Sequence, residues 1–329
     1  MRALITGISG FVGSHLAELL LKETNWTIFG MVRWRSPLDN IAALIPLAND
    51  GRRVRFVYAD LDDSLSVRDA VDEARPDYVF HLAGQSFPKT SFTAPVETLH
   101  TNVIGTVHLL DALRRHDALI HVCSSSEVYG RVPRHLLPIN EDCPFHPASP
   151  YAISKVGADL VGRHYAEAYG MKIMVTRMFT HTGPRRGDVF AESSVAKQIA
   201  MVEAGQADCV KVGNLDSLRT VADVRDAVRA YHMLLTVNPQ PGQVYNIGGN
   251  HTCTVGDILD TLIGMSDAKV PVERDPARLR PVDADLQVPD CTKFKAHTGW
   301  EPVIPFHQTM ADLLAYWRGR VKAGAVLQR

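Results

Sequence analysis

The stretch that decides the fold reads Gly7-Ile8-Ser9-Gly10-Phe11-Val12-Gly13, and it joins an apolar run at 3–6 to an amphipathic segment at 13–22. In such a GxxGxxG turn, backbone amides can approach a pyrophosphate, and the N-terminus of the next helix supplies partial positive charge. A glycine-rich turn alone can be an ordinary strand-to-helix connection. Its place near the start of the chain, between a strand and a helix, favours a dinucleotide site.

Apolar runs of strand length alternate with amphipathic stretches of helix length through the first half of the chain. This alternation is typical of parallel βαβ units whose sheet is covered by helices on both faces. The predicted strands are 3–6, 27–32, 54–58, 78–82, 119–124 and 172–177, and the predicted helices are 13–22, 66–74, 95–115 and 151–169. We therefore expect an α/β protein with a Rossmann-type doubly wound parallel sheet.

The composition changes after Phe179 to a loop rich in Gly, Arg and Asp, and then to a mixed α+β remainder. We expect residues 1–178 to form a cofactor-binding domain, with segments around 220–247 returning to it. Residues 179–219 and 248–329 are expected to form a smaller α+β substrate-binding domain.

The chain has 329 residues and a formal net charge of -1, so it lacks the basic surface expected of a protein that binds nucleic acid or anionic lipid. The cysteines form no CxxC pair and no Cys/His metal spacing, which favours a reduced, cytoplasmic setting and no metal. We identify neither a signal peptide nor an apolar segment of the roughly 20 residues that span a bilayer.

The end of the second predicted strand indicates which cofactor binds. It reads Val32-Arg33-Trp34-Arg35-Ser36, whereas a fold that prefers NAD usually carries Asp or Glu there for the ribose hydroxyl. Arg33 and Arg35 suit a 2′-phosphate, so we expect NADP, although the pair could also be a solvated basic loop. The other residues expected to line the cofactor are Gly7, Gly10, Phe11, Val12, Gly13, Asp60, Leu61, Leu82, Ala83 and Gln85.

Tyr151 and Lys155 lie one turn apart on the same face of a predicted helix. An ammonium beside a phenol lowers the pKa of the phenol, so Tyr151 could exchange a proton with a substrate hydroxyl near neutral pH. The fifth predicted strand ends in Ser125-Ser126-Glu127, at the sheet edge where open α/β sheets bind ligands. Ser125 can hydrogen-bond a reacting oxygen, and Glu127 can act as a general acid or base on a neighbouring carbon. The serines could also form a simple turn, and the carboxylate could face water.

The chain resembles the extended short-chain dehydrogenase/reductases over essentially its whole length, through GxxGxxG, Arg33, Asp60-Leu61, Leu82-Ala83-Gly84, Ser125, Tyr151 and Lys155. Within that family it looks most like the branch of GDP-mannose 4,6-dehydratases and GDP-4-keto-6-deoxymannose reductases. The stretches behind this second resemblance are Arg33, Ser125-Ser126-Glu127, Gly183-Pro184-Arg185-Arg186-Gly187, 213–219, 223–226 and Arg280-Pro281.

The resemblance implies a 4,6-dehydratase that acts on a nucleotide-activated sugar, GDP-mannose. Tyr151 would take the proton of the 4-hydroxyl while a hydride moves from carbon 4 to NADP. The 4-keto group acidifies carbon 5, so Glu127 would remove that proton and assist the departure of the 6-hydroxyl as water, before the hydride returns to carbon 6. Ser125 would hold the 4-oxygen, and Lys155 would hold the nicotinamide ribose and tune Tyr151.

The resemblance also adds residues to the expected site. His181 and Arg186 would contact the cofactor, and Arg186 would reach the cofactor phosphate. The guanidinium groups of Arg219, Arg278 and Arg280 suit the substrate diphosphate, because they bind its oxygens in a fixed fork. Further substrate contacts are expected at Ser86, Ser126, Thr180, Lys197, Asn214 and Asp283.

Other functions remain open from the sequence. The run 275–281 resembles the reductases at least as well, and a reductase needs only Ser125, Tyr151 and Lys155. A 4-epimerase would use the same three residues, and a nucleotide-sugar decarboxylase shares the Ser-Glu-Val-Tyr-Gly stretch. A non-enzymatic NADP-binding redox sensor is the alternative outside catalysis. The resemblance further implies a homodimer or homotetramer, with helices 95–115 and 151–169 at the contact.

Overall fold

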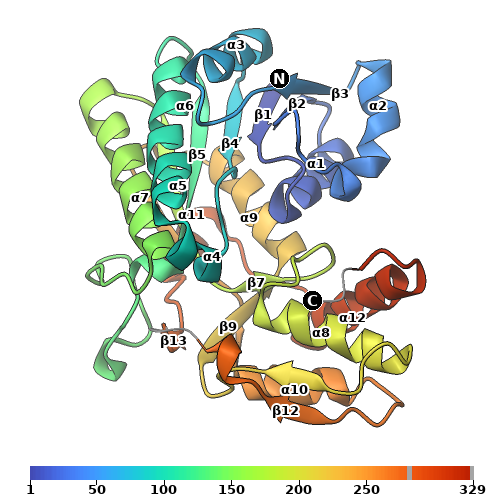
Figure 1. Cartoon of the computed structure of the whole chain (residues 1–329). Helices are drawn as coiled ribbons and strands as arrows, with labels where there is room; N and C mark the ends of the chain where they lie inside the picture. The colour runs from blue at the N-terminus through green and yellow to red at the C-terminus, as the bar shows by residue number, and fades with distance from the viewer. Residues whose placement is uncertain (280–283, 327–329) are drawn as a thin grey trace.

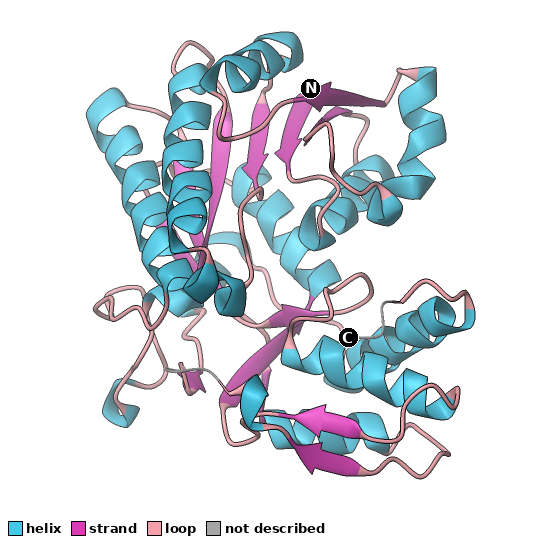
Figure 2. Cartoon of the chain, in the orientation of Figure 1, coloured by secondary structure: helices cyan, strands magenta, loops and turns pink. Residues whose placement is uncertain are grey.

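The computed structural model describes residues 1–279 and 284–326. Its centre is a seven-stranded parallel sheet with the order β10-β6-β5-β4-β1-β2-β3 (Figure 1). The strands are β1 (Arg2–Thr6), β2 (Thr27–Val32), β3 (Val54–Tyr58), β4 (Tyr78–His81), β5 (Leu119–Ser125), β6 (Ile173–Met178) and β10 (Val244–Ile247). This order and the helices on both faces confirm the predicted Rossmann-type fold (Figure 2).

Two apolar layers cover the two faces of the sheet. Residues Ala3 and Ile5 of β1 point into a core shared with α1 (Phe11–Glu23) and α9 (Val224–Thr236). Leu4, which lies between them, points into the opposite core with α3 (Ser64–Ala74) and α6 (Gly105–Leu113). Adjacent residues of β1 thus serve opposite faces, as the period of two in a strand requires.

The long helix predicted at 95–115 is divided in the structure. It begins as α5 (Pro95–Leu99), continues as a π-helical turn, η2 (His100–Ile104), and ends as α6. A separate short helix, α4 (Pro88–Thr93), precedes it. The remaining short elements of this half are η1 (Asp39–Leu44), α2 (Ile45–Asp50), η3 (Ser126–Val128) and η4 (Arg134–Leu136).

Two of the catalytic candidates, Tyr151 and Lys155, lie in the first turns of a long helix, α7 (Pro150–Tyr169). The ends of this helix are set by local sequence. The Ser149 hydroxyl accepts a hydrogen bond from the Ala152 amide at 3.0 Å, and Pro150 occupies the first turn. Gly170, with a φ of 64°, ends the helix in the left-handed conformation. Local sequence therefore sets both ends of α7.

The second half of the chain forms a smaller unit beside the carboxyl edge of the sheet (Figure 1). A third apolar core joins α8 (Ala191–Glu203), α10 (Val255–Ile263) and α12 (Phe306–Lys322). Its strands are β7 (His181–Thr182), β8 (Val210–Val212), β9 (Leu218–Asp223), β11 (His251–Thr254), β12 (Val272–Arg274) and β13 (Leu286–Gln287), and η5 (Pro276–Arg278) precedes β13.

Three segments of the second half pack on the central sheet: α9, β10 and α11 (Thr292–Thr298). β10 pairs with β6 in parallel, and α9 contributes a row of buried residues to the core beneath α1. Phe294 of α11 and Trp300, just after this helix, join the same core. From the sequence, we expected 248–329 to belong to the smaller domain. The domain boundaries themselves remain a prediction.

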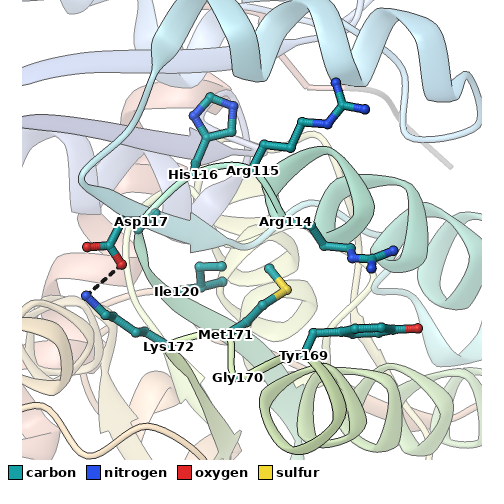
Figure 3. Close-up of a pocket in the computed structure, with 10 residues that line it drawn as sticks. Arg114, Arg115, His116, Asp117, Ile120, Tyr169, Gly170, Met171 and Lys172 are labelled. Atoms are coloured by element: carbon teal, nitrogen blue, oxygen red, sulfur yellow. Dashed lines mark ion pairs between the residues drawn. The ribbon is translucent and has the colours of Figure 1, made fainter.

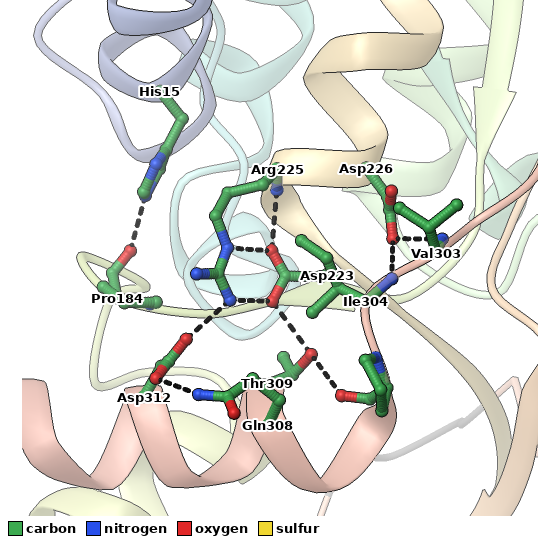
Figure 4. A network of polar contacts seen from close by, with 11 residues as sticks. His15, Pro184, Asp223, Arg225, Asp226, Val303, Ile304, Gln308, Thr309 and Asp312 are labelled. Carbon is green, nitrogen blue, oxygen red and sulfur yellow. Dashed lines mark hydrogen bonds and ion pairs between the residues drawn. The ribbon is translucent and has the colours of Figure 1, made fainter.

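A buried polar network joins the two units where α9 begins (Figure 4). The Asp223 carboxylate accepts from the Arg225 guanidinium at 2.7 and 2.8 Å and from the Thr309 hydroxyl at 2.8 Å. The Asp226 carboxylate accepts from the amides of Val303 and Ile304, both at 2.9 Å. The start of α9 therefore holds the segment that leads into α12.

Candidate active site

The glycines of the first turn allow backbone approaches that a side chain would block. Gly7 has a φ of 71°, and a Cβ there would lie 2.9 Å from the Cα of Ala83. A Cβ on Gly13 would lie 2.3 Å from the Gly7 carbonyl oxygen. Gly10 precedes the first turn of α1, and no side chain caps the helix there. No side chain therefore competes with an anion at the start of α1, and the residues present fit the pyrophosphate of a dinucleotide.

The end of β4 is fixed beside this turn by Thr6, which the sequence did not single out. Its hydroxyl oxygen accepts hydrogen bonds from the amides of Leu82 and Ala83, both at 3.1 Å. It also lies 2.9 Å from Nδ1 of His81. Burial, and secondarily the charge of Lys155, lowers the pKa of His81 to about 3, so this ring is neutral. The backbone expected to line the cofactor is therefore rigidly placed.

The side chain of Gln85 bonds to its own loop. Its amide nitrogen donates to the Phe87 carbonyl at 3.2 Å and to the Thr98 hydroxyl at 3.0 Å. Its backbone amide donates to Asn102 Oδ1 at 2.8 Å, so Asn102 in the π-helical turn anchors this loop. Gln85 consequently shapes the site, while the neighbouring Ser86 is exposed.

The predicted cofactor-specificity residues lie at the carboxyl end of β2, on the surface. Arg33 is exposed, and the Arg35 guanidinium lies 3.5 Å from the Asp60 carboxylate with 78% of its side chain accessible. Trp34 is 86% exposed. Leu61 instead faces the core, where it fills the space beside a glycine of α6. The two arginines are thus available to an anion at this edge.

The structure brings the four predicted catalytic residues to one place, where β5 ends and α7 begins. The Ser125 hydroxyl oxygen accepts from the Glu127 amide at 3.2 Å, which caps the short turn η3. The same hydroxyl hydrogen-bonds Tyr151, and the Glu127 carboxylate is close enough to act on the Tyr151 pKa through its charge. The Lys155 ammonium donates to the Cys123 carbonyl at 2.9 Å.

The prediction that the pKa of Tyr151 is lowered is wrong. Burial of the phenol raises its pKa above the ordinary value, and this effect outweighs all others. The Ser125 hydrogen bond and the charge of Arg186 lower it, whereas the Glu127 charge raises it further. Because Lys155 is directed to a backbone carbonyl, its charge does not offset the effect of burial on the pKa of Tyr151.

The loop after β7 lies against α1. His15 Nε2 lies 2.9 Å from the Pro184 carbonyl (Figure 4), and the His181 ring stacks on Phe11 with centroids 5.8 Å apart. His181 Nδ1 lies 3.0 Å from the Phe179 carbonyl, while its Nε2 is buried without a hydrogen-bond partner among the described residues. Burial lowers the pKa of His181 to about 3. A neutral ring with Nδ1 protonated leaves Nε2 as an acceptor for a ligand.

Arg186 lies in the same loop. Its guanidinium carbon is 3.4 Å from the ring centroid of Phe190 and 5.2 Å from that of Phe11. Nε lies 3.5 Å from the Glu192 carboxylate. Burial lowers the pKa of Arg186, and the charge of Glu192 opposes that shift. The predicted cofactor residues Phe11, His181 and Arg186 therefore form one cluster.

Most of the expected substrate residues of the smaller unit contact neighbouring residues of the chain. Lys197 Nζ lies 2.8 Å from the Asp188 carboxylate, and Asn214 Nδ2 donates to the Ser217 hydroxyl at 2.9 Å. Arg219 Nη1 donates to the carbonyl of Ala284, and Arg278 Nη1 donates to the Ser194 hydroxyl at 3.0 Å. Thr180 is half-buried, Ser126 is buried, and Arg280 and Asp283 lie outside the described residues.

A cavity of about 310 Å³ lies at the opposite edge of the sheet, where β5 and β6 begin (Figure 3). Within it, Lys172 pairs with Asp117 at 2.7 Å, and the Arg114 guanidinium lies 4.1 Å from the ring centroid of Tyr169. Helices α6 and α7 both end there, and the C-terminal ends of helices attract cations. These charges complement the helix ends, and none of the predicted site residues lines the cavity.

The described residues contain neither a metal-binding group of side chains nor a membrane-spanning helix. Within 1–279 and 284–326, no group of three or more His, Cys, Asp or Glu side chains is arranged to hold a metal ion. Over the same ranges, no helix combines the length and apolar character needed to cross a bilayer.

The chain is similar to known proteins over nearly its whole length. A family described as GDP-mannose 4,6 dehydratase matches residues 4–313. The chain is 34% identical to the GDP-6-deoxy-D-mannose reductase of Pseudomonas aeruginosa and 32% identical to the GDP-mannose 4,6-dehydratase of Yersinia enterocolitica. The first alignment covers 98% of both chains, and the second covers 99% of this chain and 96% of the relative.

Among solved structures, RMD from Pseudomonas aeruginosa complexed with NADPH superimposes with a TM-score of 0.82 at 30% identity, over 97% of this chain and 100% of the other. The UDP-glucose 4-epimerase of Thermus thermophilus, complexed with NAD, gives 0.83 at 27% identity, over 97% and 99% of the two chains. The chain therefore belongs to the GDP-mannose 4,6-dehydratase family, a branch of the extended short-chain dehydrogenase/reductases.

Proposed function

We propose that this protein is an NADP-dependent GDP-mannose 4,6-dehydratase, a hydro-lyase. The observation that carries the proposal is a carboxylate, Glu127, two residues after Ser125 and near the Tyr151 phenol. Transfer of a hydride at carbon 4 requires only a proton acceptor and an oxygen-binding group. Removal of water requires a further base for the proton at carbon 5, and Glu127 occupies the place of such a base.

The chain's own residues divide the proton transfers between them. Tyr151, as the phenolate, accepts the proton of the 4-hydroxyl. Burial raises the pKa of Tyr151, and the Ser125 hydrogen bond and the Arg186 charge favour the phenolate because both lower that pKa. Glu127 removes the proton at carbon 5 and passes it to the 6-hydroxyl, which leaves as water. A bound nicotinamide would supply the hydride chemistry, taking a hydride at carbon 4 and returning it at carbon 6, and carbon 5 would regain a proton from solvent.

NADP is the proposed cofactor. The glycine turn and the uncapped start of α1 fit its pyrophosphate, and the accessible Arg33 and Arg35 fit a 2′-phosphate. The related RMD structure contains NADPH, which supports the same choice. The double variant Arg33→Ala/Arg35→Ala is expected to bind NADP at least tenfold more weakly, because each charged contact is worth roughly 1.5–3 kcal/mol, with NAD affinity unchanged in isothermal titration. Equal weakening of both cofactors would contradict this assignment.

The smaller unit is proposed to bind the nucleotide diphosphate. Arg219 lies on β9 and Arg278 in η5, and guanidinium groups bind phosphate oxygens as a fork. Arg280, Asp283, Lys197, Asn214, Thr180, Ser126 and Ser86 complete the proposed substrate set. We assign guanine because the curated relatives are named for GDP sugars.

A 4-reductase that consumes GDP-4-keto-6-deoxymannose is the second candidate. The raised pKa of Tyr151 favours it, because a protonated phenol is ready to donate to a carbonyl oxygen. A relative named GDP-6-deoxy-D-mannose reductase, 34% identical over almost the whole chain, supports it as well.

One experiment separates the two reactions. The purified protein is incubated with GDP-mannose and catalytic NADP, and the product is followed by mass spectrometry and proton NMR. A dehydratase releases one water and produces a new methyl signal. Glu127→Gln should slow this reaction at least a hundredfold, because general-base catalysis contributes about 10²–10⁴-fold. A protein that leaves GDP-mannose unchanged and oxidises stoichiometric NADPH with the keto sugar is the reductase.

Assembly and location are also proposals. Exposed apolar residues on α5 and α7, including Val96 at 77%, Ile153 at 49% and Leu160 at 48% exposed, support a homodimer through these helices. Val96→Glu/Leu160→Glu should convert the dimer to a monomer in light scattering, and an unchanged mass would refute this contact. Five free cysteines support a reducing, cytoplasmic setting.

A further inference from the structure

Arg177 is a buried cation that the reaction itself does not use. It lies on β6, opposite Ser124 of β5 in the sheet register, with 2% of its side chain exposed. A charge removed from water in this way requires partners that satisfy its donors. The contacts of its guanidinium show what those partners are.

One edge of the guanidinium binds the catalytic helix. Nε donates to Asp159 Oδ2 at 2.8 Å, and Nη2 donates to Asp159 Oδ1 at 3.2 Å, which is a two-point contact. Asp159 is fully buried and follows Lys155 by one turn of α7, so it shares the face that carries Tyr151 and Lys155. Arg177 thereby fixes α7 against the sheet.

The other edge binds the turn that carries Glu127. Nη1 donates to the Tyr129 hydroxyl at 2.9 Å and to the Glu141 carbonyl at 2.8 Å. The Tyr129 hydroxyl in turn donates to Asn246 Oδ1 at 2.7 Å. Burial raises the pKa of Tyr129 to about 12, so the hydroxyl stays protonated and can accept and donate together.

We propose that Arg177 is a positioning residue that holds Glu127 in register with Tyr151, by linking Asp159 of α7 to Tyr129 through one buried guanidinium. Tyr129 follows Glu127 by two residues and caps the short turn η3, whose few backbone bonds give the turn little stiffness of its own. The bond to Arg177 supplies that stiffness. The inference rests on the proposed function for its effect on the reaction, but the positioning itself is a property of the folded chain.

The informative variant is Tyr129→Phe, because it removes the hydroxyl and leaves the buried pair of Arg177 and Asp159 intact. Elimination should slow at least about tenfold with KM within about twofold, because a base displaced by about 1 Å can lose up to 100-fold in rate. Hydride transfer at carbon 4 does not require Glu127. The absorbance of reduced cofactor during turnover should therefore rise above that of the wild type.

The matched control is Tyr165→Phe. Tyr165 of α7 is likewise a largely buried tyrosine, but its hydroxyl donates to Asp111 of α6 at 3.0 Å. This variant should turn over as the wild type does. A loss of activity shared by both variants would mean a general structural defect and would overturn the proposal.

Amide hydrogen exchange tests the positioning without catalysis. Amides of residues 126–130 should exchange at least about tenfold faster in Tyr129→Phe, while those of 151–159 keep their wild-type rates. Unchanged exchange at 126–130, or wild-type elimination despite faster exchange, would overturn the inference. A wild type that does not dehydrate GDP-mannose would refute the proposed function alone, and amide exchange would then decide on the positioning.

Discussion

Two of the buried histidines, His81 and His121, should make the stability of this protein depend steeply on pH. His81 and His121 are 5% and 0% exposed, and burial lowers the pKa of each to about 3. The perturbation is mild acidification, from about pH 7 to about pH 5. In the unfolded chain both rings regain an ordinary pKa of about 6.5 and accept protons over this range.

The sign follows from which state binds more protons. Between pH ~6.5 and ~3 the unfolded chain holds protons on both rings and the folded chain does not, so acid favours unfolding. This stabilisation is fully present above about pH 6.5 and is lost as the pH falls. Each ring lowers the free energy of unfolding by about 1.4 kcal/mol per pH unit, and the pair by about 3 kcal/mol per unit.

Urea denaturation at several pH values measures this slope. His121→Gln removes one titrating ring and keeps a side chain that can bond the Thr176 hydroxyl, which lies 2.7 Å from His121 Nε2. Its slope below pH ~6 should be smaller than that of the wild type by about 1.4 kcal/mol per unit. The exposed His307→Gln is the control and should keep the wild-type slope. An unchanged slope in His121→Gln would refute the reasoning.

Two further substitutions test the glycine turn and the junction of the two units. Gly13→Ala would place a Cβ 2.3 Å from the Gly7 carbonyl oxygen, so the affinity for NADP should fall at least about tenfold in isothermal titration. Gly319→Ala is the control and should bind NADP normally, because the space around Gly319 is open. Asp226→Asn removes a buried carboxylate that accepts hydrogen bonds from two amides and from an arginine, so the free energy of unfolding should fall by about 2–3 kcal/mol. The exposed Asp260→Asn is the control and should show no measurable change. Wild-type NADP affinity in the first variant, or wild-type stability in the second, would contradict these contacts.

The sequence was most informative where function depends on local spacing. The GxxGxxG turn and the pair Tyr151 and Lys155 are each encoded within a few neighbouring residues, and the period of the apolar runs predicted every strand of the main sheet up to β6. A strand-to-helix turn and one helical turn are short-range geometry, so they can be read directly from the chain.

What the sequence could not predict depends on contacts between distant residues. Arg177 reads only as the end of an apolar strand, and its link between Asp159 and Tyr129 exists because three elements meet in space. The raised pKa of Tyr151 likewise follows from burial, which spacing does not reveal. A charged residue inside an otherwise apolar strand was the available signal for Arg177, because such a residue is seldom buried without a partner.

The return of late segments to the central sheet has a consequence for synthesis of the chain. Strand β10 forms one edge of the sheet, α9 covers one of its faces, and Phe294 and Trp300 complete the core beneath them. A ribosome must therefore release nearly the whole polypeptide before the nucleotide-binding half can close, even though its first six strands emerge early. An N-terminal fragment that stops at 217 would leave β6 as an open edge and the apolar side of α1 without its cover, exposing both to chaperones or to aggregation.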